Sequence, residues 1–317
     1  MKHDPALARH LLPALQEACN GRLDGVSWFR ADWQRGGAST ARAKWLFDGQ
    51  PDRAVVIKFP VVPRELYWTR RLQNTDGTPP AMVPHLFASG QSLGNYDLAW
   101  MVIEELPFGP LGMRWHRDHI ARICKAAARF QQVTFDLPVE DATPRIESWV
   151  DLLDRARSGV RENALPKQPR WVAALKRVQR SCDALVAHWR ERDGSHWIHG
   201  DLHLANAMSR ASAQAGDVIL IDLAEVRCGH WTEDAVFLER QLWARPDRLD
   251  ATKPVREMAR ARRKLDLEVE EDALELIDIR RVLMAATAPA FLRTEGHPRH
   301  LNGSLAQLEA ALDRLGA

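Results

Sequence analysis

The chain has 317 residues, of which 45% are hydrophobic and 27% are charged, and these proportions are typical of globular proteins. Its 44 Lys and Arg residues nearly balance its 42 Asp and Glu residues, so the net charge of +2 gives no indication of a nucleic-acid or membrane partner. The four cysteines lack CxxC spacing and no apolar run reaches about 18 residues, which argues against a zinc site and favours a cytoplasmic protein.

The N-terminal part of the chain predicts a small strand-rich lobe over residues 1–106. It begins with an amphipathic helix that has Leu7, Leu11, Leu12 and Leu15 on one face. Three strands follow, VSWFRADW, RAKWLFDG and AVVIKF, separated by turns at RGGAST and QPDR. We expect a helix over 63–73 and two further strands, over 83–90 and 97–106.

The segment PFGPLG interrupts this pattern, and residues 107–317 predict a larger helical lobe. Apolar residues spaced by three and four predict helices over 117–135 and 170–192, with 157–169 as a loop between them. HWIHGDLHLANAM and the short strand of DVILIDLAEV come next, and several helices follow from Thr232 to the end. A strand-rich lobe followed by a helical lobe is an α+β plan.

Polar side chains stand out in the two segments between the helices. Asp201 and Asn206 lie in a stretch too polar for a core strand, and Asp222 ends the apolar strand VILID. Oxygen ligands from Asp and Asn suit Mg²⁺, which proteins usually hold with one or two carboxylates together with substrate phosphates. That assignment leaves Asp201 to accept a proton from an attacking hydroxyl.

Upstream, Lys58 ends an otherwise apolar strand and needs an anionic partner. Phosphate oxygens or Glu65 on the next predicted helix would serve. RGGAST, which contains Gly37, Ser39 and Thr40, offers flexible backbone N–H groups and hydroxyls that could cover a phosphate. Loop, lysine, glutamate and catalytic-loop acids occur in the order found in phosphoryl-transfer sites.

Simpler interpretations exist for each element. The polar residues of the loop could merely cap turns, Lys58 could extend to solvent from a strand end, and RGGAST could be an ordinary turn. His199 is expected to brace the loop through hydrogen bonds rather than to transfer protons. His203 either packs the loop or faces a substrate, and neither it nor Glu225 has an assigned role.

HGDLHLANAM followed by VILIDLAEV resembles the catalytic and metal-binding segments of the aminoglycoside phosphotransferase and choline kinase-like family. The resemblance extends over roughly residues 26–241. It implies a bilobal protein-kinase-like fold that uses ATP and Mg²⁺. There is no GxGxxG motif, and Gly200 rather than Arg precedes Asp201, so control by an activation-loop phosphate is not expected.

The resemblance also implies a role for individual residues. Asp201 would be the catalytic base, with Asn206 and Asp222 as metal ligands. Lys58, paired with Glu65, would hold the α- and β-phosphates. The segment MVIEELPFG would be the interlobe hinge, in which Glu104 and Leu106 contact adenine through their backbone, and Asp234 would brace the catalytic loop.

These observations predict an ATP-dependent phosphotransferase that acts on a hydroxyl of a small molecule. AMP transfer or protein phosphorylation on the same scaffold is an alternative, and so is a nucleotide-binding regulatory module without turnover. The acceptor could be an aminoglycoside, a macrolide, a choline-like alcohol, homoserine or a sugar, because the fold and the catalytic loop are common to all of them. The sequence does not indicate the oligomeric state.

Overall fold

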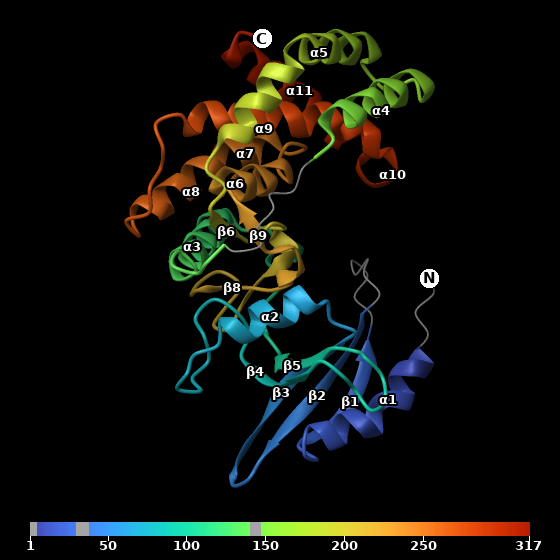
Figure 1. The fold of residues 1–317 in the computed structure, drawn as a ribbon, viewed down its shortest axis with the longest axis vertical. Coiled ribbons are helices and arrows are strands. Elements are labelled where there is room, and N and C mark those ends of the chain that lie inside the picture. Colours follow the sequence, from blue (N-terminus) through green and yellow to red (C-terminus); the bar gives the residue numbers. More distant parts are fainter. Residues whose placement is uncertain (1–4, 30–37, 140–146) are drawn as a thin grey trace. The chain divides into compact units, whose positions relative to one another are not determined.

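The computed structural model describes residues 5–29, 38–139 and 147–317, and it contains two compact units (Figure 1). The first unit comprises Met1–Arg114 and Ala205–Val226, and the second comprises Trp115–Leu204 and Arg227–Ala317. The segment Ala205–Val226 therefore belongs to the first unit, although the chain on either side of it belongs to the second.

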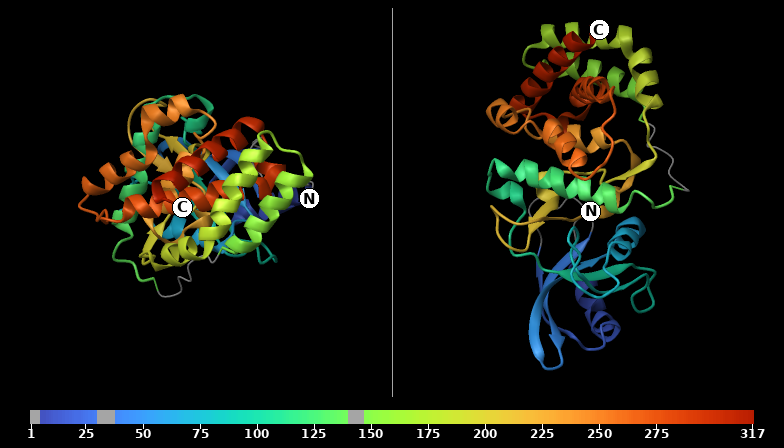
Figure 2. Two further views of the ribbon diagram at one scale, coloured as in Figure 1. Left: turned by 90° about the horizontal axis from the view of Figure 1, so that it is seen from above. Right: turned by 90° about the vertical axis from the view of Figure 1, so that its left-hand side faces the viewer.

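The main feature of the first unit is a five-stranded antiparallel sheet with the strand order β1-β2-β3-β5-β4. Its strands are β1 (Leu23–Phe29), β2 (Ser39–Phe47), β3 (Gln50–Phe59), β4 (Leu86–Gly90) and β5 (Trp100–Glu104). The turn of the long β2–β3 hairpin (Figure 2, blue) is formed by Asp48 and Gly49, not by residues 50–53 as predicted. Gly49 has a φ of 74°, which glycine adopts without strain, and Asp-Gly is a favoured hairpin turn.

Helix α1 (Pro5–Ala18) packs on one face of this sheet. Leu11 and Leu15 join a buried cluster with residues of β2, β3 and β5. Leu7 was predicted to share this face, but it is 48% exposed and Ala8 is buried instead. The buried face of the helix therefore starts one residue later than the leucine pattern predicts.

Helix α2 (Pro63–Arg71) packs on the opposite face of the sheet. Its Leu66 forms a separate cluster with Val61 and Met101. Successive strand residues point to opposite faces, and Ile57 belongs to the cluster of α1. The side chain of Lys58 therefore projects toward α2, which is why a lysine can follow an apolar run without entering the α1 core.

The segment Ala205–Val226 adds a small hairpin to the first unit. β7 (Ala207–Ser209) pairs antiparallel with β8 (Val218–Leu220), between the 3-10 turns η2 (Leu204–Asn206) and η3 (Leu223–Glu225). The backbone N–H of Leu220 donates to Met82 O at 2.6 Å, and Phe108 and Ser209 exchange two backbone hydrogen bonds. These bonds fix the hairpin to the rest of the unit.

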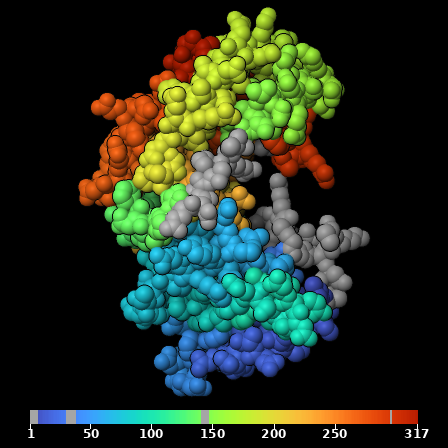
Figure 3. All heavy atoms as spheres, viewed as in Figure 1, coloured from blue at the N-terminus to red at the C-terminus, as the bar shows by residue number. Residues whose placement is uncertain are grey.

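The second unit is mainly helical. Its longer helices are α3 (Asp118–Val133), α4 (Trp149–Glu162), α5 (Gln168–Glu191), α6 (Trp231–Arg240), α8 (Pro254–Arg263), α9 (Ala273–Thr287) and α11 (Pro298–Leu315), with 3-10 turns and the short α7 (Pro246–Thr252) and α10 (Leu292–Glu295) between them. β6 (His196–Ile198) and β9 (Arg227–Gly229) form a two-stranded antiparallel sheet. The end of α11 (red in Figure 3) lies beside α5, where Arg177 donates to the carbonyl of Ala317.

The predicted α+β plan is confirmed, but the prediction of a loop over 157–169 was wrong in its first half. Helix α4 continues through Arg157 to Glu162. The buried residues Leu153, Ala156 and Val160 supply a spacing of three and four. Most of this apolar pattern lies before residue 157, so the polar end of the helix resembled a loop.

No helix within residues 5–29, 38–139 and 147–317 is both long and apolar enough to span a membrane.

Candidate functional site

In the first unit, Lys58 forms an ion pair with Glu65, as the sequence suggested. Lys58 Nζ lies 2.6 Å and 2.7 Å from the two carboxylate oxygens of Glu65. This ion pair joins β3 to α2. Glu65 is 3% exposed, and its burial raises its pKa above the ordinary value although the charge of Lys58 opposes this. Asp222 Oδ1 is 3.6 Å from the same Nζ, so the lysine is shared by two acids.

Asn206 and Asp222 lie at the same end of the β7–β8 hairpin. Ala207 is paired with Leu220, and Ile221 N donates to Asn206 O at 3.0 Å, which extends the ladder by one residue. Asn206 is thus opposite the residue that precedes Asp222. The side chain of Asp222 is 45% exposed, so its carboxylate is accessible to a ligand. The hairpin therefore brings the backbones of Asn206 and Asp222 close together, and amide and carboxylate oxygens are both ligands that suit Mg²⁺.

The residues predicted to contact adenine lie at the end of β5. Glu104 N donates to His85 O at 2.8 Å, and the Glu104 carboxylate accepts three hydrogen bonds from Arg210. Leu106 follows the strand and is 6% exposed. The side chain and the N–H of Glu104 are therefore engaged by the protein, so the predicted adenine contact of Glu104 would have to come from its carbonyl oxygen.

Of the three residues predicted to form the phosphate cover, Gly37 lies outside the described residues. Ser39 and Thr40 begin β2, where the Thr40 hydroxyl donates to Phe29 O at 3.0 Å. Both residues are partly buried.

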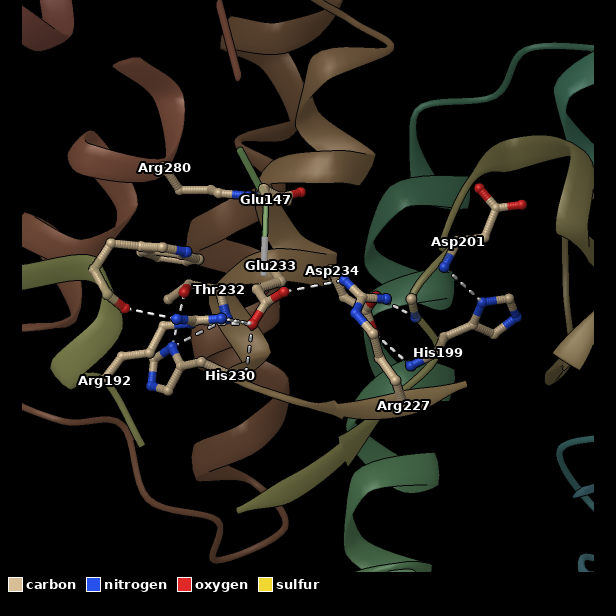
Figure 4. Close-up of polar contacts among 12 residues, drawn as sticks. Glu147, Arg192, His199, Asp201, Arg227, His230, Thr232, Glu233, Asp234 and Arg280 are labelled. Atoms are coloured by element: carbon tan, nitrogen blue, oxygen red, sulfur yellow. Dashed lines mark hydrogen bonds and ion pairs between the residues drawn. The ribbon is translucent and has the colours of Figure 1, made fainter. Parts of the chain in front are cut away.

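In the second unit, a tight loop carries Asp201 directly after β6 (Figure 4). Gly200 has a φ of 79°, a left-handed conformation that favours glycine. His199 is fully buried, and its Nδ1 accepts a hydrogen bond from Asp201 N at 3.3 Å. The side chain of Asp201 is 31% exposed and lies 3.4 Å from Nε2 of His203. The loop thus has a fixed backbone and presents an accessible carboxylate.

The side chain of Asp234, in α6, accepts hydrogen bonds from the backbone of this loop (Figure 4). One carboxylate oxygen accepts from His199 N and the other from Gly200 N, both at 2.9 Å. Asp234 is 1% exposed, and its burial raises its pKa, while His199, Arg227 and the two N–H donors oppose the rise. His199 and Asp234 therefore both contact the loop that they were predicted to support.

Sequence reasoning missed a second contact between α6 and the loop. The side-chain oxygen of Gln241 accepts from Leu204 N at 3.1 Å. Gln241 follows Asp234 by seven residues, which is two helical turns and therefore the same face. That spacing was a usable signal, and it means that the backbone is anchored both before and after Asp201.

Sequence reasoning also missed a buried cluster of charges next to Asp234. The neighbouring Glu233 is 6% exposed and accepts hydrogen bonds from Arg192, from Arg227 and from His230 N (Figure 4). Burial opposes ionisation of Glu233, but the charges of Arg280, Arg192 and Arg227 outweigh it and lower its pKa. Arg227 is in β9, which pairs with β6, so this cluster supports the strand that leads into the loop.

We expect Asp234→Asn to destabilise the protein by about 1–3 kcal/mol, because the amide places a donor against one of the two backbone N–H groups. The free energy of unfolding, measured with urea, checks this value. Asp250→Asn, which changes an exposed aspartate of α7, is the matched control and should change stability little. Equal stability of the two variants would show that the buried contacts of Asp234 contribute nothing.

The two groups of residues suit two parts of one reaction. In the first unit a lysine and two oxygen ligands, Asn206 and Asp222, could hold a metal-bound polyphosphate. In the second unit Asp201 could accept a proton from a hydroxyl. In the sequence, Asp201 and Asn206 are separated by four residues.

The comparisons with known proteins agree with this chemistry. The model of the phosphotransferase enzyme family matches residues 35–266, well over half of the chain. None of the curated proteins matches the sequence.

Solved structures resemble the chain over nearly its whole length. A microcompartment-associated aminopropanol kinase has a TM-score of 0.60 at 16% identity, covering 96% of this chain and 98% of that one. A Ralstonia eutropha JMP134 protein provisionally assigned as an aminoglycoside phosphotransferase has a TM-score of 0.59 at 13% identity, with coverages of 95% and 97%. A thermostable mutant of aminoglycoside phosphotransferase APH(4)-Ia, in a ternary complex with AMP-PNP and hygromycin B, has a TM-score of 0.53 at 13% identity, with coverages of 96% and 97%. These likenesses establish the predicted protein-kinase-like fold.

Proposed function

The chain belongs to the phosphotransferase enzyme family, and we propose that it transfers the γ-phosphoryl group of ATP to a hydroxyl of a small molecule. The observation that carries this proposal is the arrangement of Asn206 and Asp222 at one end of a hairpin, with Asp222 3.6 Å from the Lys58 that is paired with Glu65. Oxygen ligands beside a lysine are what a metal–nucleotide complex requires.

Each nucleotide contact is assigned to a residue of the first unit. Lys58 binds the α- and β-phosphates, and its pairing with Glu65 holds the ammonium group in place. The Glu104 carbonyl and the Leu106 N–H contact adenine, while Gly37, Ser39 and Thr40 cover the phosphates. Asn206 and Asp222 would hold Mg²⁺, which would supply positive charge that neutralises the phosphates of ATP.

Asp201 acts on the acceptor. Its carboxylate orients the acceptor hydroxyl and takes its proton as the hydroxyl oxygen bonds to the γ-phosphorus. The bond between that phosphorus and the β,γ-bridging oxygen breaks, and ADP leaves with the electron pair. His199, Asp234 and Gln241 fix the backbone of the loop, so that the carboxylate is already oriented before the reaction.

A small hydroxylated molecule is the proposed acceptor because of what the similar structures contain. One of them is an aminopropanol kinase, and another holds hygromycin B together with AMP-PNP. Aminopropanol and hygromycin B are both small molecules, although the two molecules differ greatly from each other.

An ADP-release screen over hydroxylated metabolites and antibiotics tests the function, with Asp201→Ala protein as the blank. We expect ADP release that depends on one class of acceptor, and a product heavier by one phosphate in mass spectrometry. A product heavier by AMP, or a phosphorylated protein, would replace this proposal with another transfer reaction. Saturable ATP binding without transfer to any acceptor would favour a regulatory module.

We expect Lys58→Met to lower kcat/KM for ATP by roughly 10²-fold, because the cation that neutralises the phosphates is lost. Steady-state kinetics with the acceptor found in the screen would measure this effect. Lys44→Met is the matched control, because Lys44 is an exposed lysine of the neighbouring strand β2. If both variants retain wild-type kcat/KM, Lys58 does not bind the phosphates.

A further inference from the structure

We propose that Arg210 and Glu104 form a positioning pair that couples the adenine-binding segment, residues 104–106, to the metal-binding hairpin, residues 206–222. Arg210 directly follows β7, the strand that Asn206 precedes. Glu104 ends β5, the strand that leads into the adenine-binding segment. This inference rests on the proposed function, and all of its residues belong to the first unit.

The pair is a forked, charge-assisted contact. Arg210 Nε lies 2.8 Å and 2.9 Å from the two oxygens of Glu104, and Nη2 lies 2.8 Å from one of them. Their side chains are 27% and 21% exposed, so water screens the pair only in part. A guanidinium group gives this geometry and a lysine does not, because the planar fork matches a carboxylate.

The remaining donors of Arg210 extend the connection. Nη1 donates to Pro80 O at 2.6 Å, and Nη2 donates to Val83 O at 3.0 Å. Between these two residues, Met82 O accepts from Leu220 N of β8. A single side chain thus joins β5, the loop before β4 and the hairpin that carries the proposed metal ligands.

Close to the Arg210–Glu104 pair, the backbone at residues 108–109 lies directly against β7, so the two segments cannot easily shift relative to each other. Phe108 and Ser209 exchange hydrogen bonds at 3.2 Å and 2.7 Å. Gly109 has a φ of 144°, and a Cβ at this position would lie 2.9 Å from the Met208 side chain and 3.0 Å from its Cα. Only glycine allows the chain after the adenine-binding segment to come so close to β7.

The consequence concerns nucleotide affinity. Adenine contacts near Glu104 and metal ligands on the hairpin can bind one Mg·ATP molecule together only if the distance between them is fixed. Arg210 fixes this distance, so the loss of Arg210 should weaken Mg·ATP binding. The adenine contacts or the metal ligands could still bind their own part of the nucleotide separately. Asp201 is not part of this connection, so kcat should change less than KM.

Calorimetric titration with a non-hydrolysable ATP analogue and Mg²⁺ tests this inference without knowledge of the acceptor. We expect Arg210→Met to weaken binding at least tenfold, which corresponds to about 1.4 kcal/mol. Glu104→Gln should weaken it as well, and the double variant should lose no more than Arg210→Met alone, because both changes break the same pair. Arg210→Lys should recover only part of the affinity.

Arg42→Met is the matched control. It breaks another Arg–Glu contact of the same sheet, to Glu105 at 2.7 Å, but the Arg42 side chain is 62% exposed and the pair does not involve the hairpin. It should bind the analogue as wild type does. Each titration is made well below the melting temperature of the variant, so that the protein is folded. If the Arg210–Glu104 pair only stabilised the fold, its loss would lower the melting temperature and leave the affinity for the analogue unchanged.

The possible results separate the two hypotheses. Folded Arg210→Met and Glu104→Gln proteins that bind within twofold of wild type would overturn the coupling. If Arg210→Met does not fold, Arg210→Lys and Glu104→Gln decide the question by the same criterion. Wild-type protein that binds no analogue would overturn the proposed function itself.

Discussion

Asp201→Asn protein is expected to transfer phosphate about 10³-fold more slowly than wild type while binding Mg·ATP normally, because an amide cannot accept the proton of the acceptor hydroxyl. The substitution is nearly isosteric. The Asp201 backbone N–H still donates to His199, and Asp234 still holds the two preceding N–H groups, so the loop should keep its conformation. The loss should therefore appear in kcat and not in the affinity for nucleotide.

Single-turnover kinetics with the identified acceptor would measure the rate of the chemical step. Asp250→Asn, on the exposed surface of α7, should retain the wild-type rate. A rate for Asp201→Asn above a tenth of the wild-type value would mean that another group accepts the proton. His203, 3.4 Å from the Asp201 carboxylate, would then be the next residue to change.

The largest expected effect on stability follows from Glu233→Ala, which should lower the free energy of unfolding by about 3–5 kcal/mol. The side chains of Arg192 and Arg227 are only 8% and 12% exposed, and the substitution would remove a shared counter-charge from both. Urea denaturation measures the effect. Glu309→Ala is the matched control: it breaks an exposed pair with Arg170 and should cost less than about 1 kcal/mol.

The same carboxylate should make stability depend on pH. Arginine charges lower the pKa of Glu233 in the folded protein, so its contribution is present above the unfolded value of about 4.3 and is lost as the pH falls below it. Wild-type protein should therefore lose more stability than Glu233→Gln protein as the pH falls from 7 to values well below about 4.3. Equal losses in the two proteins would show that Glu233 does not contribute to acid sensitivity.

Several parts of the candidate site could be predicted because they depend on local sequence. Alternation along AVVIKF determines that Lys58 points away from the face that carries Ile57. The spacing of Lys58 and Glu65 lets a strand and the next helix form an ion pair. The role of Asp234 was instead implied by the family resemblance, and the positive φ of Gly200 was not predicted.

The errors arose where a local pattern was ambiguous. Arg157–Glu162 has few apolar residues of its own, so only the packing of the preceding turns shows that α4 continues. The β2–β3 turn was placed at a proline, whereas Asp48-Gly49 was the stronger signal because it allows a two-residue hairpin. The turn was displaced by only two residues, whereas helix α4 itself had not been predicted.

The sequence by itself determined the family, the α+β plan and the order of the residues proposed to act on ATP, because these are recorded in motifs and in periodic patterns a few residues long. Tertiary structure decided which long side chains meet. Arg210 pairs with Glu104 across 106 residues, and Arg192 pairs with Glu233 across 41. No local pattern contains such a partner: an arginine can reach many carboxylates, and only the folded backbone determines which of them lies within hydrogen-bonding distance.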